Sequence, residues 1–187
     1  MTAMTANILE TEARDAAPAL TFDAVYEAHF DYVWHSVRRL GGRSADQEDL
    51  VHDVFVTFMR TMDRFDPTRP VKPWLFGITF RIVSDYRRRG SFKREIPVAE
   101  MDEAASQGDP STHLEASRRR QLVMKALEFL SNDERAILVM VELQGHSVVE
   151  AARVLEANEN TLYSRLRSAR KTLTAALRKL GAVGESP

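Results

Sequence analysis

Apolar residues recur every three or four positions through most of this chain, and this helical period constrains the fold more than any other feature. The first stripe consists of Phe22, Val25, Tyr26, His29, Phe30, Val33, Trp34, Val37 and Leu40. Gly41-Gly42 follows and predicts the end of that helix, because glycine accepts the left-handed conformation found after helix C-termini. The next stripe, in a helix that begins at Ser44 or Asp46, consists of Leu50, Val51, Val54, Phe55, Phe58, Met59 and Met62. No strand pattern competes with these helices.

Prolines decide where the third helix begins. The stretch from Phe65 to Pro73 contains three prolines and predicts a loop, because proline lacks an N–H donor and disfavours helical geometry in the residue before it. A helix from Trp74 to about Arg89 follows, and its expected core residues are Trp74, Leu75, Ile78 and Ile82. These helices predict one small domain over residues 21–90, after a disordered leader at residues 1–20 that lacks an apolar period.

An acidic stretch separates this domain from a second one. Every charged residue from Glu95 to Glu115 is acidic, and prolines and a glycine interrupt the sequence there, which predicts a flexible linker over residues 91–113. Helical stripes resume in a second predicted domain over residues 114–181, followed by a tail at residues 182–187. The predicted architecture is therefore all-α, with two small helical domains joined by a flexible acidic linker.

The second domain contains a helix-turn-helix pattern over residues 145–171. Capping boxes at Ser131–Glu134 and Ser147–Glu150 predict two helix starts, and Asn158 can cap the last helix. Hydroxyl and guanidinium groups near the start of such a helix can contact base edges and phosphates in a major groove. The residues expected to do so are Thr161, Tyr163, Ser164, Arg165, Arg167, Ser168 and Lys171. The alternative is a solvated basic face on an ordinary helical hairpin.

The net charge of −1 conceals two basic patches, one at residues 81–94 and one at residues 161–180. The first patch includes Arg87, Arg88 and Arg89 at a helix end, where cations also suit the helix dipole without any DNA. Phe76 and Phe80 lie off the core stripe of that helix, beside Arg81. Exposed aromatic rings near guanidinium groups can stack on unpaired bases, and the alternative is that both rings pack inside the bundle.

Other function classes find little support. The chain has no cysteine, which excludes disulfides and thiolate metal sites. No apolar run approaches the roughly 20 residues of a membrane span, and residues 1–20 do not resemble a signal peptide, so we expect a cytoplasmic protein without membrane insertion. Glu48, Asp49, His52 and Asp53 suggest half of a di-iron site, but the second motif is missing. We therefore expect no metal, no cofactor, no catalytic residue and no enzymatic activity.

Five motifs in a fixed order carry a resemblance to a known family. They are Asp46-Gln-Glu-Asp-Leu-Val-His-Asp-Val-Phe55, Trp74-Leu-Phe-Gly-Ile78 with Asp85-Tyr-Arg-Arg-Arg89, Leu130-Ser-Asn-Asp-Glu-Arg135, Val148-Val-Glu-Ala-Ala152, and Thr161-Leu-Tyr-Ser-Arg-Leu-Arg-Ser-Ala-Arg-Lys171. From about Phe22 to Leu180 the chain resembles the bacterial RNA polymerase sigma factors of the sigma-70 family, in particular the extracytoplasmic function (ECF) group. The resemblance implies a promoter-specificity subunit with a region 2 domain and a region 4 helix-turn-helix domain.

The resemblance also implies partners and site residues. The largest-subunit clamp helices of core RNA polymerase would dock on Asp49, Leu50, Asp53, Val54 and Phe55. The minus-10 element would be read and melted by Arg69, Lys72, Trp74, Phe76, Phe80, Arg81, Arg87 and Arg88. The helix-turn-helix would read the double-stranded minus-35 element and sit on the second-largest-subunit flap. An anti-sigma factor is the remaining expected partner.

Two departures from the family pattern concern DNA contact and the helix-turn-helix turn. The family usually has Asn where this chain has Arg81, and a smaller or basic residue at Phe80, which affects the base preference expected at minus-10. The turn lacks glycine, so we expect Asn158 or Asn160 to adopt the left-handed conformation. A stand-alone helix-turn-helix regulator, with the first domain sensing a ligand or dimerising, is the main alternative function.

Overall fold

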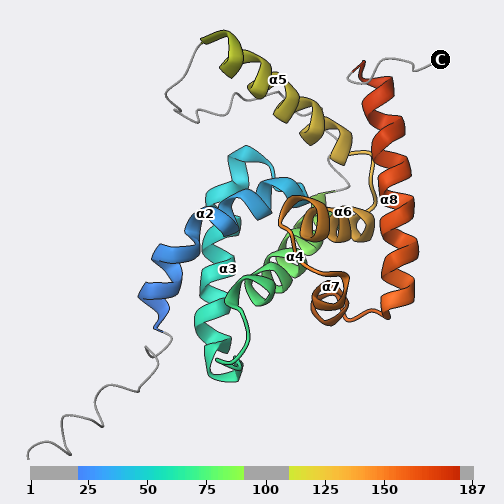
Figure 1. The fold of residues 1–187 in the computed structure, drawn as a ribbon. Helices are drawn as coiled ribbons and strands as arrows, with labels where there is room; N and C mark the ends of the chain where they lie inside the picture. The colour runs from blue at the N-terminus through green and yellow to red at the C-terminus, as the bar shows by residue number, and fades with distance from the viewer. Residues whose placement is uncertain (1–20, 91–109, 182–187) are drawn as a thin grey trace, which may run out of the picture.

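The computed structural model describes residues 21–90 and 110–181, and all of their regular elements are helical (Figure 1). The first module consists of α2 (Phe22–Leu40), α3 (Gln47–Thr61) and α4 (Val71–Gly90). The second consists of α5 (Pro110–Leu127), α6 (Asn132–Leu138), α7 (Val148–Val154) and α8 (Glu159–Lys179). Short turns of 3-10 helix lie at Ser44–Asp46 and Met62–Arg64, and a π-helical turn at Val139–Leu143. The prediction of an all-α fold with a helix-turn-helix in its second half is confirmed.

Local sequence explains the ends of most helices. Gly41 has φ +103° and donates its N–H to the carbonyl of Arg38, so it ends α2 as predicted. Both predicted capping boxes are present: the Ser131 and Ser147 side chains accept the N–H groups of Glu134 and Glu150, whose carboxylates reach back to the caps.

Two predicted boundaries are wrong, and proline is the reason in each. α4 begins at Val71 rather than Trp74, so Pro73 lies within its first turn. Likewise α5 begins at Pro110, inside the segment predicted to be linker. The first N–H groups of a helix have no acceptor within it, so proline costs little in the first turn. The rest of the predicted linker, the leader and residues 182–187 lie outside the described residues.

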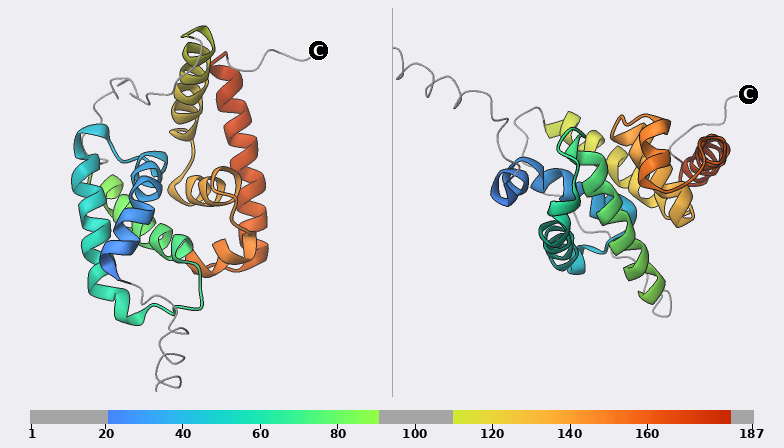
Figure 2. Two further views of the ribbon diagram at one scale, coloured as in Figure 1. Left: turned by 60° about the vertical axis from the view of Figure 1, so that its left-hand side comes forward. Right: turned by 90° about the horizontal axis from the view of Figure 1, so that it is seen from below.

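The two modules pack against each other and share one hydrophobic core. Buried side chains run without a break from Val25 in α2 to Ala169 in α8. Contacts between α4 and α7, and between α2 and the α6 region, join the modules. In Figure 2 the three helices of the first module lie on one side and α8 lies along the far edge of the second.

A buried arginine lies in this contact between modules. Arg135 is 3% exposed, and its Nε donates to the carbonyl oxygen of Leu127 at 2.8 Å. Its guanidinium lies so close to Gly41 that any side chain at residue 41 would collide with it. Burial and, second, the nearby Arg87 cation lower the pKa of Arg135 to about 9. The Gly41-Gly42 turn therefore makes room for the second module as well as ending α2.

Candidate nucleic-acid interface

The helix-turn-helix is formed by α7 and α8. Asn158 accepts the N–H of Asn160 at 2.8 Å and caps α8, as predicted. The left-handed residue of the turn is Glu156, with φ +51°, so the expectation that Asn158 or Asn160 would take this role is wrong. Asn158 has φ −67° because an N-cap needs extended geometry. Glu156, a residue type that rarely adopts positive φ, therefore makes the turn without glycine.

Polar contacts to the α6 region fix the orientation of α8. Arg165 pairs with Asp133 at 3.1 Å, and the Ser168 hydroxyl donates to Glu134 at 2.6 Å. The Nε of Arg170 donates to Glu142 at 3.0 Å. The Ser168 bond, first among the causes, and the capping bonds from Ser131 lower the pKa of Glu134. These bonds stabilise α8 against the rest of the second module.

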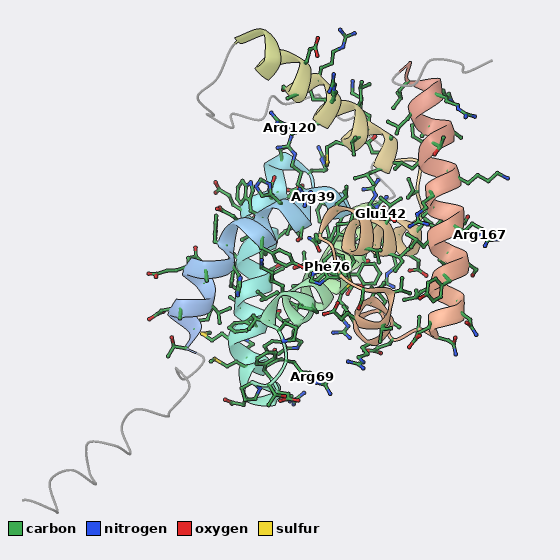
Figure 3. All side chains as sticks on the ribbon, viewed as in Figure 1. Arg39, Arg69, Phe76, Arg120, Glu142 and Arg167 are labelled. Carbon is green, nitrogen blue, oxygen red and sulfur yellow. The ribbon has the colours of Figure 1, made fainter. Side chains whose placement is uncertain are left out.

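The structure divides the predicted minus-35 residues into two groups. Arg165 and Ser168 face α6 and are bonded to it. Tyr163, which is 56% exposed, Arg167 and Lys171 are exposed to solvent, as are Thr161 and Ser164. No ion pair of Arg167 or Lys171 is found within residues 21–90 and 110–181. Arg167 lies on the side of α8 away from the first module (Figure 3).

Several of the predicted minus-10 residues on α4 are less accessible than those on α8. Phe76 is fully buried between the modules (Figure 3), so the interpretation of Phe76 as an exposed base-stacking ring is wrong. Phe80 is half-buried. The exposed Arg81 forms an ion pair with Glu156 of the helix-turn-helix turn. Arg87 is half-buried and donates to the carbonyl of Leu40 at 3.2 Å.

Of the remaining minus-10 candidates, Arg69, Lys72 and Trp74 lie in or next to the loop before α4, and Arg88 lies in the last turn of that helix. Asp66 accepts the N–H and hydroxyl of Thr68, which together lower the pKa of its carboxyl group. Arg69 pairs with Asp66 at 3.2 Å and lies at the tip of this loop (Figure 3). The Trp74 ring stacks on Phe65 with centroids 4.7 Å apart. The other candidates are exposed: Lys72, whose ammonium lies over the Tyr32 ring, and Arg88, which pairs with Asp85 at 2.7 Å.

The predicted polymerase-binding residues on α3 also fall into two groups, one exposed and one buried. Asp49 and Asp53 are exposed, as expected of a docking face. Leu50, Val54 and Phe55 are at most 5% exposed and pack in the core, and Phe55 also lines the groove described next. That these three residues contact a partner stays a prediction. Residues four apart share a helix face, so the apolar members of this motif point inward while its acids point outward.

An aromatic groove next to these acids was missed by sequence reasoning. Its volume is about 480 Å³ and its lining residues are Phe22, Tyr26, Phe30, Trp34, Glu48, Val51, His52, Phe55, Val56 and Met59. The α2 rings recur every four residues, with successive centroids 5.4–5.9 Å apart. Tyr26 is 40% and Met59 50% exposed at the rim. The four-residue spacing of the aromatic residues on α2 could have indicated the groove, but the helical period favoured the interpretation that all of them lie in the core.

The described part of the chain offers no metal site. Within it, no group of three or more His, Asp or Glu side chains is arranged to hold an ion. Glu48 and His52 line the aromatic groove instead. Nor do the described helices include one with the length and apolar character needed to span a bilayer.

Comparison with known proteins identifies the family. The profile described as Sigma-70 region 2 matches residues 25–92, and the one described as Sigma-70, region 4 matches residues 120–173. RNA polymerase sigma factor NccH of Alcaligenes xylosoxydans xylosoxydans is 30% identical over 174 residues, covering 90% of this chain and 94% of NccH. ECF RNA polymerase sigma factor EcfG of Rhodopseudomonas palustris is 32% identical over 152 residues, covering 79% and 80%. The chain belongs to the ECF group of sigma factors.

Solved structures share the fold of this sigma factor. Sigma factor RpoE of Bartonella quintana, in complex with the anti-sigma factor NepR, superposes with a TM-score of 0.65 at 24% identity, covering 84% of this chain and 96% of RpoE. CnrH, in complex with the cytosolic domain of CnrY, gives 0.62 at 29%, covering 84% and 88%. Sigma factors direct promoter-specific transcription initiation, and as a family they are regulatory subunits rather than enzymes.

Proposed function

We propose that this sigma factor binds core RNA polymerase, directs it to promoters through both a minus-35 and a minus-10 element, and promotes melting of the minus-10 DNA. The single observation that carries this proposal is the exposed row of Tyr163, Arg167 and Lys171 on a capped α8 whose opposite side is bonded to α6. A recognition helix needs one face held by the protein and one face free for the major groove. The stand-alone regulator lacks such support, because the groove in the first module is open rather than enclosed as a ligand-sensing pocket would be.

At minus-35, we propose that Arg167 contacts a base edge and that Lys171 and Thr161 contact phosphates. Arginine donates bidentately to guanine, whereas lysine acts as a point charge on the backbone. Arg165 and Ser168 would contribute by orienting α8, because their side chains are bonded to α6. Tyr163 and Ser164 lie on the exposed first turns of the same helix.

At minus-10, we propose that Phe80 and Arg81 contact the unpaired bases, with Trp74 supporting the loop that carries Arg69. Aromatic rings and guanidinium planes both stack on unpaired bases. Lys72 and Arg88, which are exposed, would contact the backbone. Arg87 would stabilise the end of α2 through the carbonyl of Leu40.

We propose that polymerase docks on the first module along Asp49 and Asp53, with the aromatic groove beside them receiving apolar side chains of the clamp helices. Glu48 and apolar side chains of α3 line the groove, and the exposed Asp49 and Asp53 belong to the same helix, so α3 offers a partner both apolar and acidic groups. Such a face fits a basic amphipathic helix. An anti-sigma factor that uses the same face would compete with polymerase, and the second module would contact the flap. We place the two domains at residues 21–90 and 110–181, the second beginning with α5, and we expect the protein to act in the cytoplasm.

Run-off transcription with purified core polymerase, this protein and fragmented DNA from its own genome tests the proposal. We expect discrete start sites that appear only when the protein is added, with a shared pair of upstream elements. Absence of new starts, together with DNA binding by the protein alone, would contradict the sigma-factor function and favour the stand-alone regulator.

The docking face is tested by reversing one charge. Asp53→Arg should reduce co-elution with core polymerase at least 10-fold, because it places a cation opposite the basic partner that we propose. Asp63→Arg, an exposed acid beyond the end of α3, is the matched control and should leave assembly unchanged. The melting temperature of both variants reports whether the fold is intact, and unaltered assembly of the Asp53 variant would remove this face from the interface.

A further inference from the structure

Tyr163 on α8 is the most exposed of the large hydrophobic side chains in the described part of the chain, at 56%. Other exposed rings there have partners: Tyr26 packs against Phe55 with ring centroids 4.7 Å apart, and the Lys179 ammonium lies 5.4 Å from the centre of the Phe129 ring. Within residues 21–90 and 110–181, no ring, cation or hydrogen-bond partner of Tyr163 is found. An isolated exposed ring is common on protein surfaces, so its position on α8 decides what it means.

Tyr163 lies on the face of α8 that we propose reads the minus-35 element. α8 begins at Glu159, so Tyr163 lies in its second turn, close to the capped N-terminus. Arg167 and Lys171 follow at intervals of four residues and share its face, whereas the opposite side of the helix is bonded to the α6 region. The N-terminal residues of a recognition helix are the ones that reach base edges in the major groove. In the proposed complex the ring of Tyr163 is therefore directed at the bases.

The major groove offers one apolar group to such a ring. Base edges there present hydrogen-bond donors and acceptors, and among the four bases only thymine adds a C5 methyl group. The carbon ring of tyrosine cannot pair with a donor or an acceptor, but it packs on a methyl group and removes it from water. The neighbouring hydroxyl of Ser164 is less free to read a base, because it donates to the carbonyl oxygen of Thr161 at 2.8 Å. The chemistry of this position favours contact with a C5-methylated pyrimidine.

We propose that Tyr163 is a specificity-determining residue of the minus-35 contact, whose ring packs on the C5 methyl group of a thymine and accepts 5-methylcytosine at the same position. The inference rests on the proposed function and names the base chemistry that this residue reads. Four residues of α8 span about 6 Å, and stacked base pairs lie about 3.4 Å apart. The thymine therefore lies within about two base pairs of the base that Arg167 contacts.

Replacement of thymine by deoxyuridine tests the contact, because uracil forms the same base pair and lacks only the C5 methyl group. Promoter fragments that carry one such replacement at a time across the minus-35 element, on either strand, are titrated with the polymerase holoenzyme that contains this sigma factor. We expect one position at which the replacement weakens binding about 4-fold, which is the change expected when one methyl group stays in water.

Variants at Tyr163 separate this contact from other contributions to binding. Tyr163→Ala should bind the thymine and uracil fragments equally at that position, whereas Tyr163→Phe keeps the ring and should keep the 4-fold difference. Phe129→Ala, which truncates an exposed aromatic ring outside α8, is the matched control and should also keep it. Thermal melting followed by circular dichroism reports whether the variants are folded. A uracil effect of the same size in Tyr163→Ala, or no sensitive thymine at all, would overturn the assignment.

Methylated cytosine supplies an independent comparison. At the sensitive position, a fragment with a cytosine–guanine pair is compared with one in which that cytosine carries a C5 methyl group. We expect the wild-type holoenzyme to bind the methylated fragment about 4-fold more tightly, and Tyr163→Ala to bind both fragments equally. Equal binding by the wild-type holoenzyme would overturn the acceptance of 5-methylcytosine. A holoenzyme that binds fragments with and without the minus-35 element equally would instead overturn the proposed function.

Discussion

The two helices proposed to read DNA, α4 and α8, differ in how exposed their proposed DNA-contacting side chains are. α8 is bonded to α6 on one side and presents Tyr163 and Arg167 to solvent on the other. α4 has Phe76 fully buried and Arg81 paired with Glu156. The reading face proposed for α8 is thus exposed to solvent, whereas part of the face proposed for α4 is covered by the other module.

The difference follows from the chemistry of the two surfaces. A helix that reads a duplex can be polar and therefore remain exposed without cost. A helix that captures unpaired bases needs aromatic and apolar groups, which are favourably buried when no DNA is present. In the structure α2, α3 and α7 all pack on α4 and together cover its apolar side chains.

The largest expected effect tests the burial of α4. Phe76→Ala should lower the free energy of unfolding by about 3–5 kcal/mol, because it empties a fully buried site. Phe80→Ala, at a half-buried position on the same helix, should cost only about 1–2 kcal/mol. Urea unfolding followed by circular dichroism measures both. Equal, small losses would mean that Phe76 is not a core residue in solution.

The prediction with the next largest expected effect tests whether the exposed face of α8 contacts DNA. Arg167→Ala should weaken binding of the polymerase holoenzyme to minus-35 DNA by about 1–3 kcal/mol if the residue contacts a base edge, while stability changes by less than about 0.5 kcal/mol. Arg170→Ala, which removes an arginine bonded to Glu142 on the same helix, is the matched control and should affect binding less. Equilibrium binding to promoter fragments gives both values, and an unchanged affinity would exclude Arg167 from base recognition.

A prediction with a smaller expected effect tests whether a residue of α8 stabilises the helix or contacts DNA. Ser168→Ala should lower the free energy of unfolding by about 0.5–1 kcal/mol, because its hydroxyl donates to the Glu134 carboxylate at an exposed site. Ser164→Ala removes a hydroxyl that bonds only within its own helix, to the carbonyl of Thr161, and should cost less. A Ser168 variant with unchanged stability and impaired promoter binding would return Ser168 to the DNA contacts.

The prediction with the smallest expected effect concerns the pH dependence of the free energy of unfolding. Desolvation, and secondly the nearby Lys72 cation, lower the pKa of His29; desolvation also lowers the pKa of His146, which Glu150 partly opposes. Both imidazoles are therefore favoured as neutral in the folded protein, and the unfolded protein binds more protons as pH falls through about 6.5. Stability should decrease from about pH 7.5 to about pH 5.5.

Urea unfolding across this range checks the sign. His146→Gln should flatten the dependence, since it removes one of the two imidazoles whose pKa is lowered. The carboxylates whose pKa values are lowered, Asp66, Glu134 and Glu150, titrate below their ordinary ranges and so act outside this window. A slope of the opposite sign would contradict the neutral state of these histidines.

The sequence by itself determined the helices, their caps and the family. Helical period, the two capping boxes and Gly41 are local signals, because each depends on residues within about one turn. They predicted α2, α3, α6, α7 and α8 and the helix-turn-helix, and the ordered motifs gave the family. Local signals failed at Pro73 and Pro110, where the tolerance of a first helical turn for proline depends on where the helix starts.

Only the tertiary structure decided which faces are free. Several features depend on how helices that are far apart in sequence pack. They are the burial of Phe76, the inward side chains of Leu50, Val54 and Phe55, the pairing of Arg81 with Glu156, and the groove beside Tyr26. Sequence period shows that a helix has an apolar stripe, but not which neighbour covers a residue at the edge of that stripe. The contact between α4 and α7 is the clearest case. Gly77 and Val154 touch although they are 77 residues apart in the sequence, and no local pattern marks either residue.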